Sequence, residues 1–446
     1  MFLLLDILSG NLSNATGTGL HAFIYYFSNI IGFVFFLIYF HQMVYLVLGS
    51  LKHKPLDHVP AKQANIGIII SARNESAVIG NLIESIYKND YPKDKYRIFV
   101  IADNCTDNTA QICRDLGCIV FERNDAKLVG KGYALHYLFD ILHNDPAWQK
   151  YIPDAYLVLD ADNLIKPNYI SEMNRVYDRG YGMVTSYRNS KTIGKNWISA
   201  GYGYWFMHEA RHLNNSRMAL HTSCAISGTG FLISTEWVKQ FDNWYFFTLT
   251  EDIQCSTEYA LLGNNVGYSA SAELFDEQPE TLAQSWTQRE RWAKGFYQVF
   301  GKYGKVLLQG CFKRFSCFDV LTTIFPALII TLSLFIVLPM TALITAIIGD
   351  TVNSLFALQC LLGYIQTFYC LMAFIATLVV ITEWKKIYCS NAKKILYIFT
   401  FPLFMFTYLP ISITALFKKV EWKPIYHSNS VNIEDFESED KVTATL

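Results

Sequence analysis

Hydrophobic residues are distributed unevenly along the 446 residues of this chain. Long apolar stretches lie near the N-terminus and again after about residue 319, whereas the region between them alternates short apolar runs with polar stretches. This pattern is typical of membrane segments that flank a folded domain, not of one large soluble core. It predicts membrane helices at residues 22–48, 320–348 and 355–382, followed by a last apolar segment at 395–417.

Basic residues beside these segments predict their orientation. Lys52 and Lys54 follow the first segment, whereas residues 1–21 contain no lysine or arginine. Because cytoplasmic flanks are enriched in basic residues, we expect residues 1–21 to be extracellular and the central domain to be cytosolic. The turn at residues 349–351 has no basic residue and is expected outside. The chain is therefore predicted to be a multi-pass protein of the cell membrane in contact with membrane lipids.

The last apolar segment, residues 395–417, leaves two alternatives open. Basic residues flank both of its ends, and Pro402 and Pro410 interrupt it. A straight crossing would place the second basic cluster outside, whereas a kinked or re-entrant segment keeps both clusters inside. The charge pattern favours the kinked form. The acidic tail at 433–446 has little apolar surface to bury and is expected to be disordered.

The central region, residues 60–300, predicts an α/β domain. Apolar, β-branched runs at 66–70, 97–102 and 155–159 predict buried strands, and amphipathic stretches between them predict helices. Strands that alternate with helices favour a mostly parallel sheet. Polar and basic helices at 286–318 are predicted to lie at the membrane surface before the next apolar segment.

Composition narrows the possible partners. The net charge is −1, and no basic tract is interleaved with aromatic residues, so no nucleic-acid partner is expected. The ten cysteines include no C-x-x-C pair, and most lie in the middle region or in apolar runs. They are interpreted as reduced, buried side chains, not as disulfides or a zinc site.

Polar residues follow each of the three predicted strands. In parallel α/β sheets, ligands bind at the carboxyl ends of the strands. Each of these segments alone is an ordinary loop or helix cap, but three of them at one edge indicate a binding crevice. The candidate residues after the strands are Ala72, Arg73, Asn74 and Glu75, then Asp103, then Asp160 and Asp162.

Asp160 and Asp162 are separated by one small residue after a hydrophobic strand, so both side chains are expected to point the same way. Two carboxylates together with a nucleotide diphosphate suit Mg²⁺ or Mn²⁺, because these hard cations keep phosphate oxygens and water as ligands. Lys131, between two glycines, supplies a cation near phosphate. The sequence therefore predicts a metal–diphosphate site.

A second group of candidates lies further along the chain. Glu251 and Asp252 open a predicted helix with Thr250 as its cap, where the helix dipole alone would favour acidic residues. Gly228 and Thr229 belong to a small-residue turn that allows a substrate to approach the backbone.

The pentapeptide at 288–292 completes this group. Gln288, Arg291 and Trp292 share one helical face, which offers an amide, a guanidinium for phosphate oxygens and an indole that can stack on a sugar. Arg289 lies between them in sequence.

These motifs, in this order, resemble family 2 glycosyltransferases of the membrane-integrated, processive kind, such as bacterial cellulose synthase, hyaluronan synthase, chitin-oligosaccharide synthase and poly-N-acetylglucosamine synthase. The resemblance covers about residues 60–300 by motif. It implies a GT-A-like domain joined to an α-helical membrane region. It also implies that uridine is held by Arg73, Asn74, Glu75 and Asp103, and the nucleotide and metal by Asp160 and Asp162.

The same resemblance implies that Asp252 is the catalytic base, beside Glu251, and that Gln288, Arg289, Arg291 and Trp292 meet the diphosphate and the acceptor sugar. The T-E-D sequence at 250–252 is closer to cellulose and poly-N-acetylglucosamine synthases than to the G-D-D form. The F-x-V-T-x-K gating loop of cellulose synthase is not evident.

The sequence therefore predicts an inverting β-glycosyltransferase that polymerises a UDP-hexose, with UDP-glucose favoured, and passes the growing polysaccharide across the membrane. UDP-N-acetylglucosamine as donor, or transfer of one sugar to a lipid acceptor, are the alternatives. With one predicted N-terminal span, a second copy or an accessory subunit is expected to complete a channel.

Overall fold

The structure is a computed structural model that describes residues 19–51, 59–325, 327–422 and 432–433, with the side chains of 327–330 left out. The predicted extracellular segment and the predicted disordered tail therefore lie almost wholly outside the described residues.

An eight-stranded mixed sheet forms the centre of the domain, in the order β3-β2-β1-β4-β7-β6-β8-β5. Strands β1 to β4 pair in parallel, β7 runs antiparallel to both β4 and β6, and β8 is parallel to β6. The predicted strands at 66–70, 97–102 and 155–159 are β1, β2 and β4. The strands are Ile66–Ala72, Tyr96–Asp103, Ile119–Arg123, Ala155–Asp160, Leu164–Ile165, Met183–Ser190, Phe231–Ser234 and Gly267–Asp276, numbered β1 to β8.

Helices cover both faces of the sheet. Successive side chains of a strand point to opposite faces, so each strand contributes to two buried clusters. In β1, Ile68 and Ile70 pack with one buried cluster that includes Leu82 of α3, whereas Ile69 packs with a second cluster that includes Phe139 of α5. The helices of the domain are α3 Ile79–Tyr87, α4 Thr109–Asp115, α5 Lys131–Asn144, α6 Tyr169–Tyr177, α7 Trp197–His208, α8 Asn215–Ala219, α9 Thr235–Gln240 and α10 Glu251–Leu261. A π-helical turn, Glu209–Asn214, joins α7 to α8, and short 3₁₀ turns lie at Lys93–Lys95 and Gln149–Tyr151.

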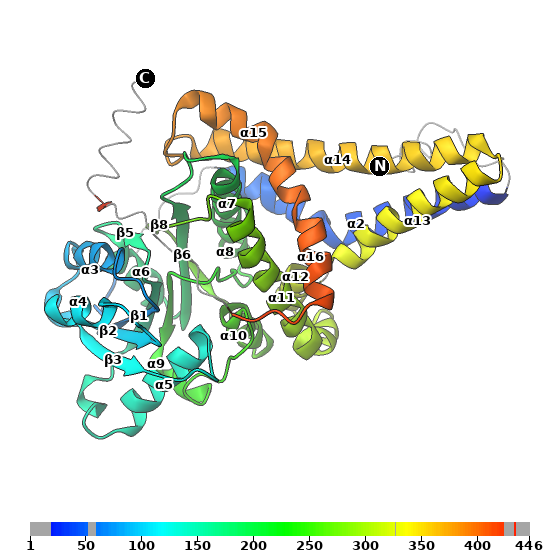
Figure 1. Ribbon diagram of the computed structural model, residues 1–446. Helices are drawn as coiled ribbons and strands as arrows, with labels where there is room; N and C mark the ends of the chain where they lie inside the picture. The colour runs from blue at the N-terminus through cyan, green and yellow to red at the C-terminus, as the bar shows by residue number, and fades with distance from the viewer. Residues whose placement is uncertain (1–18, 52–58, 326, 423–431, 434–446) are drawn as a thin grey trace.

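Long helices extend to one side of this domain (Figure 1). They are α2 Gly19–Ser50, α13 Ala327–Ile347 and α14 Thr351–Glu383, which pack on one another, while α15 Asn391–Phe406 packs on α14 and α7. Among the described residues, three helical segments are long and apolar enough to cross a membrane: Gly19–Ser50, Thr351–Glu383 and Asn391–Phe417. The first two contain the predicted membrane helices at 22–48 and 355–382.

The helix predicted at 320–348 is instead divided into α12, Phe315–Ile324, and α13. Phe325 between them is extended, with φ −62° and ψ 130°. The next residue in the sequence is a proline, and a residue before proline is disfavoured in the helical conformation. Residues 320–324 therefore belong to the shorter helix that follows α11, Leu282–Gly310, and the surface helices predicted at 286–318 extend beyond that range.

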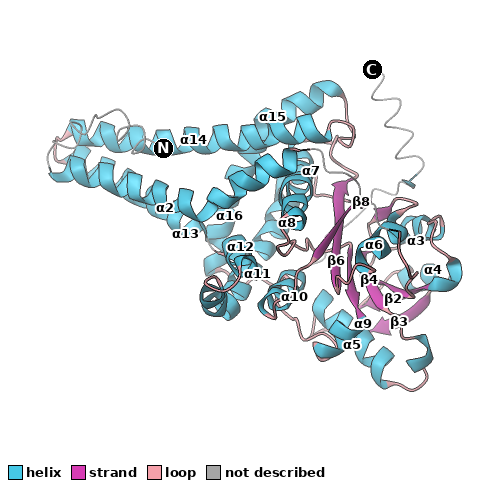
Figure 2. Cartoon of the chain, turned by 180° about the vertical axis from the view of Figure 1, so that it is seen from behind, coloured by secondary structure: helices cyan, strands magenta, loops and turns pink. Residues whose placement is uncertain are grey.

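The last apolar segment is interrupted at Thr407, where α15 ends and α16, Tyr408–Phe417, begins. Pro410 lies in the first turn of α16, where a proline costs no helical hydrogen bond. Helix α16 packs along α11, as the view from behind also shows (Figure 2). Lys294 of α11 donates hydrogen bonds to the carbonyl oxygens of Ala415 and Leu416, so the end of α16 is held against α11.

Candidate active site

A cavity of about 600 Å³ lies between the carboxyl ends of the parallel strands and the helices α2, α7, α10, α11, α12 and α16. Most of the residues predicted to form a site line this one cavity. They are Ala72, Arg73, Glu75, Asp103, Lys131, Asp160, Asp162, Gly228, Glu251, Asp252, Gln288, Arg291 and Trp292.

Two arginines lie near the ends of β1 and β2, and they have different partners. The carboxylate of Asp103 is buried and accepts a hydrogen bond from Nη1 of Arg123 at 2.6 Å. Burial raises the pKa of Asp103, and the Arg123 guanidinium opposes this rise. The guanidinium of Arg73 lies over the ring of Trp422, 5.2 Å from its centroid, and Trp422 also lines the cavity. The sequence analysis missed Trp422, which lines the cavity, and Arg123, which holds Asp103 in place.

The two aspartates after β4 have separate partners. Nζ of Lys131 lies 2.5 Å from Oδ1 of Asp160 and also donates to the carbonyl oxygen of Gly228 at 2.8 Å. Asp162 accepts a hydrogen bond from the backbone N–H of Glu277 at 2.8 Å. The described residues include no group of three His, Cys, Asp or Glu side chains that could hold a metal ion. Asp160 and Asp162 therefore fit Mg²⁺ or Mn²⁺ only as a two-carboxylate site that diphosphate oxygens and water complete.

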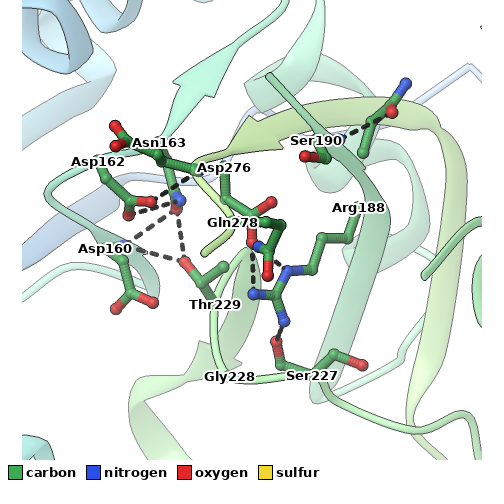
Figure 3. Close-up of polar contacts among 12 residues, drawn as sticks. Asp160, Asp162, Asn163, Arg188, Ser190, Ser227, Gly228, Thr229, Asp276 and Gln278 are labelled. Atoms are coloured by element: carbon green, nitrogen blue, oxygen red, sulfur yellow. Dashed lines mark hydrogen bonds and ion pairs between the residues drawn. The ribbon is translucent and has the colours of Figure 1, made fainter. Parts of the chain in front are cut away.

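Hydrogen bonds of the turn at 227–229 link the loop that carries Asp160 and Asp162, here called the D-x-D loop, to α10. The N–H of Gly228, which has φ +82°, donates to Oδ2 of Asp252 at 2.6 Å. The hydroxyl of Thr229 donates to Oδ1 of Asn163 and accepts from the N–H of Asp160 (Figure 3). Thr229 does not line the large cavity, so its position supports the loop and does not fit the predicted direct contact with the acceptor.

Glu251 and Asp252 begin α10 at the cavity, and both carboxyl groups are buried. Burial and the charge of Asp252 raise the pKa of Glu251 to about 7, against the opposing charge of Lys131. Burial also raises the pKa of Asp252, while backbone N–H groups stabilise its ionised form. Thr250 occupies the predicted cap position, and its side chain makes no cap hydrogen bond. A carboxylate with a raised pKa in a cavity suits a general base.

Helix α11 presents the predicted face to the cavity. Gln288, Arg291 and Trp292 all line it, and burial lowers the pKa of Arg291 while three carboxylates nearby raise it. The indole of Trp292 packs edge-on against Tyr202, with ring centroids 5.7 Å apart. The amide, guanidinium and indole therefore meet the cavity together.

Arg289 is turned away from this face. Its side chain is fully buried, and Nη1 donates to the carbonyl oxygen of Phe404 at 3.2 Å and to the hydroxyl of Thr407 at 2.7 Å. The guanidinium also stacks on Phe404 and Tyr408. This placement contradicts the prediction that Arg289 meets the diphosphate, because a residue next to Gln288 lies about 100° around a helix. Arg289 instead joins α11 to the break between α15 and α16.

Asn74 also differs from its predicted role. It has a positive φ of 58°, and its side-chain oxygen accepts a hydrogen bond from the N–H of Thr106 at 2.7 Å. It does not line the cavity. Asn74 therefore holds the loop after β1 against the loop after β2, and its neighbours Arg73 and Glu75 reach the cavity.

Two further cavity residues, Arg188 and Asp276, form a buried ion pair (Figure 3). Arg188 also donates to the carbonyl oxygen of Ser227 at 2.5 Å and lies over the ring of Phe206. The pair forms because β6 and β8 are parallel neighbours, with Ser190 opposite Asp276. No sequence motif contains both residues, so only a correct strand pairing could have predicted them.

The cavity continues from this polar end to the membrane helices. Tyr39 and Gln42 of α2, Thr322 of α12, and Tyr408 and Ser412 of α16 line its other end. Beside it, Arg217 makes a bidentate pair with Asp319, at 2.8 and 2.9 Å, which joins the domain to α12. One continuous space thus connects the strand ends with the membrane side of the molecule.

The sheet, the strand-end loops and the carboxylates around one cavity define a GT-A-like nucleotide-sugar domain. A mannosyltransferase from Pyrobaculum calidifontis, solved in complex with GDP-Man and Mn²⁺, shares this fold with a TM-score of 0.52 and 15% identity, over 88% of this chain and 99% of that one. Residues 63–295 match the family described as "Glycosyltransferase like family 2", and the chain belongs to that family. The predicted family and fold class are confirmed.

Relatives within the family differ in their products. A poly-beta-1,6-N-acetyl-D-glucosamine synthase from Staphylococcus aureus is 28% identical over 262 residues, which cover 56% of this chain and 58% of the relative. A beta-monoglucosyldiacylglycerol synthase from Nostoc sp. is 23% identical over 268 residues, which cover 57% and 54%. The chain thus spans between about half and two thirds of the length of these relatives.

Proposed function

We propose that this protein is an inverting, processive β-glycosyltransferase that polymerises a UDP-hexose, with UDP-glucose as the favoured donor, and passes the polysaccharide across the membrane. The observation that carries this proposal is the single cavity. It contains Asp160, Asp162 and Asp252 at one end and reaches the membrane helices at the other.

The polar end of the cavity has the groups that a nucleotide-sugar donor needs. Arg73 and Asp103 lie at the strand ends where a nucleoside would bind, and Lys131 and Arg291 can neutralise the diphosphate. Mg²⁺ or Mn²⁺, when bound by Asp160 and Asp162, would stabilise negative charge on the leaving diphosphate.

Asp252 acts as the general base in this proposal. It accepts the proton of an acceptor hydroxyl while that oxygen forms a bond to the anomeric carbon of the donor and the bond from that carbon to the diphosphate breaks. Attack on the face opposite the leaving group inverts the configuration. The N–H of Gly228 holds the Asp252 carboxylate at 2.6 Å and so fixes the direction of proton transfer.

The acceptor enters from the membrane side. Trp292 offers an indole to the sugar at the end of the growing chain, and aromatic stacking tolerates the sliding that repeated addition requires. The basic residues after α2 and α14 favour a cytosolic domain and an extracellular N-terminus. A second copy or an accessory subunit would supply the remaining walls of a channel.

Transfer to a lipid is the second candidate function. The Nostoc relative is a beta-monoglucosyldiacylglycerol synthase, and residues of α2, α12 and α16 line the cavity, so that a membrane lipid could reach it between these helices. In that case the product would be a glucolipid and no polymer would form.

The two functions are distinguished by their products. The full-length protein, reconstituted in lipid vesicles, is incubated separately with radiolabelled UDP-glucose and UDP-N-acetylglucosamine in the presence of Mg²⁺ or Mn²⁺. Linkage-specific hydrolases then digest any polymer, and organic extraction recovers any labelled lipid. Polymer protected inside inverted vesicles supports translocation, whereas label found only in the lipid extract replaces the first function by the second.

A further inference from the structure

The wall of the cavity opposite α11 is formed by α7 and the π-helical turn that follows it. Trp205, Phe206, Glu209 and Leu213 all line the cavity from this wall. Glu209 is the first residue of the π-helical turn, and such turns are frequent at functional sites. The rings of Phe206 and Trp292 lie 6.2 Å apart, so the aromatic residues of the two walls meet.

Glu209 is a carboxylate without a cationic partner in direct contact among the described residues. Its one hydrogen bond there is from the hydroxyl of Ser227 to Oε2. Burial raises the pKa of Glu209, whereas the hydrogen bond from Ser227 and the nearby charges of Arg217 and Arg188 oppose this rise. A carboxylate that is largely buried in protein requires hydrogen-bond donors, and its atom Oε1 receives none from the described residues.

Glu209 is also close to the proposed base through the backbone. Ser227, which donates to Glu209, precedes Gly228, whose N–H donates to Asp252. The carboxylates of Glu209 and Asp252 are therefore hydrogen-bonded to the same turn, and both line the same cavity. A substrate that presents two neighbouring hydroxyl groups can donate to both of them.

We propose that Glu209 is an acceptor-binding residue that accepts a hydrogen bond from a hydroxyl of the acceptor's terminal sugar, beside the hydroxyl that Asp252 deprotonates. Trp292 covers an apolar sugar face while Glu209 binds its edge. This inference rests on the proposed glycosyltransferase function and specifies its acceptor as a molecule with at least two adjacent hydroxyls. A diacylglycerol, with one free hydroxyl, leaves Glu209 without a donor.

The test separates the acceptor from the donor. Full-length Glu209→Gln and Glu209→Ala proteins in lipid vesicles are supplied with UDP-glucose or UDP-N-acetylglucosamine, whichever the unaltered protein consumes. Two rates are measured: release of UDP to water without added acceptor, and transfer to soluble oligosaccharides of the same sugar or to diacylglycerol. Glu258→Gln is the matched control, because Glu258 accepts hydrogen bonds from Tyr245 and Tyr303 and does not line the cavity.

The expected result is a rise in the oligosaccharide KM of about tenfold or more in both Glu209 variants, the loss typical of a hydrogen bond to a charged group. UDP release and the affinity for UDP should stay within about twofold of the control. A parallel fall in UDP release and transfer overturns the inference, because Glu209 would then only support the turn at 227–229. Transfer by the unaltered protein to diacylglycerol but not to oligosaccharide overturns it as well.

The proposed function fails in a different way. If the unaltered protein neither consumes a UDP-hexose nor binds UDP, the glycosyltransferase proposal itself is wrong, and the acceptor role of Glu209 is wrong with it. Unchanged oligosaccharide KM in Glu209→Gln, with normal consumption of the donor, rejects Glu209 alone. Thermal unfolding of each variant identifies any loss of activity that follows from loss of folding.

Discussion

The two ends of the cavity are built differently. The end proposed to bind the donor, called the donor end below, consists of loops at the carboxyl ends of β1, β2 and β4, and each loop is one short sequence motif. The end proposed to bind the acceptor, called the acceptor end, consists of helix faces from α2, α7, α11, α12 and α16, which are far apart in sequence. A donor site can thus be encoded locally, whereas an acceptor site depends on how helices pack.

Charge also distinguishes the two ends. At the donor end, cations and carboxylates are paired within the site, as in Lys131 with Asp160 and Arg123 with Asp103. At the acceptor end, aromatic side chains dominate, and Arg217 is already paired with Asp319. The donor end therefore suits a diphosphate, and the acceptor end suits an uncharged sugar. The predictions below test this division.

The largest effect is expected at the boundary between the two ends. Asp252→Asn should lower turnover by about 10²-fold or more, because the acceptor hydroxyl loses its general base, while UDP binding stays nearly unchanged. Steady-state rates and UDP titration measure the two effects. In the unaltered protein, kcat/KM should fall with falling pH below the raised pKa of Asp252, because only the ionised carboxylate accepts a proton. Near-normal turnover in Asp252→Asn would exclude Asp252 as the base.

Metal removal tests the donor end alone. Excess EDTA should lower donor consumption by roughly tenfold to a hundredfold, since the charge of the leaving diphosphate loses its counter-ion, and Mg²⁺ or Mn²⁺ should restore it. Asp162→Asn should raise the Mn²⁺ concentration required for half-maximal rate. Full activity in EDTA would show that Lys131 and Arg291 neutralise the diphosphate without a metal ion.

Sequence reasoning brought the strand-end residues to one crevice, and most of them line one cavity, because their positions follow from strand placement. The run at 66–70 predicts β1, found at Ile66–Ala72, and the residues after it reach the cavity. Arg123 and Arg188 were missed, because their ion pairs depend on which strands are neighbours and in what register. Which side chains meet across neighbouring strands depends on strand order and register, and the local sequence of one strand specifies neither.

Helical periodicity explains both a success and an error at 288–292. The spacing of Gln288, Arg291 and Trp292 predicted one face, and all three line the cavity. The same spacing excludes Arg289 from that face, yet the family resemblance assigned it to the substrate.

The helix break at Phe325 follows from the proline after it in the sequence. That signal is weaker than the continuous hydrophobicity of the segment, so the sequence predicted one helix there.

A comparison of two arginines sharpens the division further. Arg291→Ala should raise the KM for the UDP-sugar by about tenfold, because the diphosphate loses a hydrogen bond from a charged guanidinium. Arg289→Ala should leave that KM within about twofold and instead lower the thermal unfolding temperature, since Arg289 binds Phe404 and Thr407 at the α15–α16 break. Donor titration and unfolding curves of both variants check this. Equal losses of donor affinity would mean that α16 positions the donor end as well.

The smallest effect is expected at the acceptor end, where the contact is an aromatic face. Trp292→Ala should lower polymer yield by roughly tenfold or less, the size of one stacking interaction, and should shorten the product because each sugar dissociates more readily before the next addition. Release of UDP to water should be nearly unchanged, since Lys131 and Arg291 still hold the donor. Trp292→Phe is the matched control, because a smaller ring retains part of the stacking. The indole also packs on Tyr202, so thermal unfolding must be compared in both variants. If polymer yield and UDP release fall together in a folded protein, Trp292 only packs α11 against α7, and the acceptor end must be sought among Tyr39, Gln42 and Tyr408.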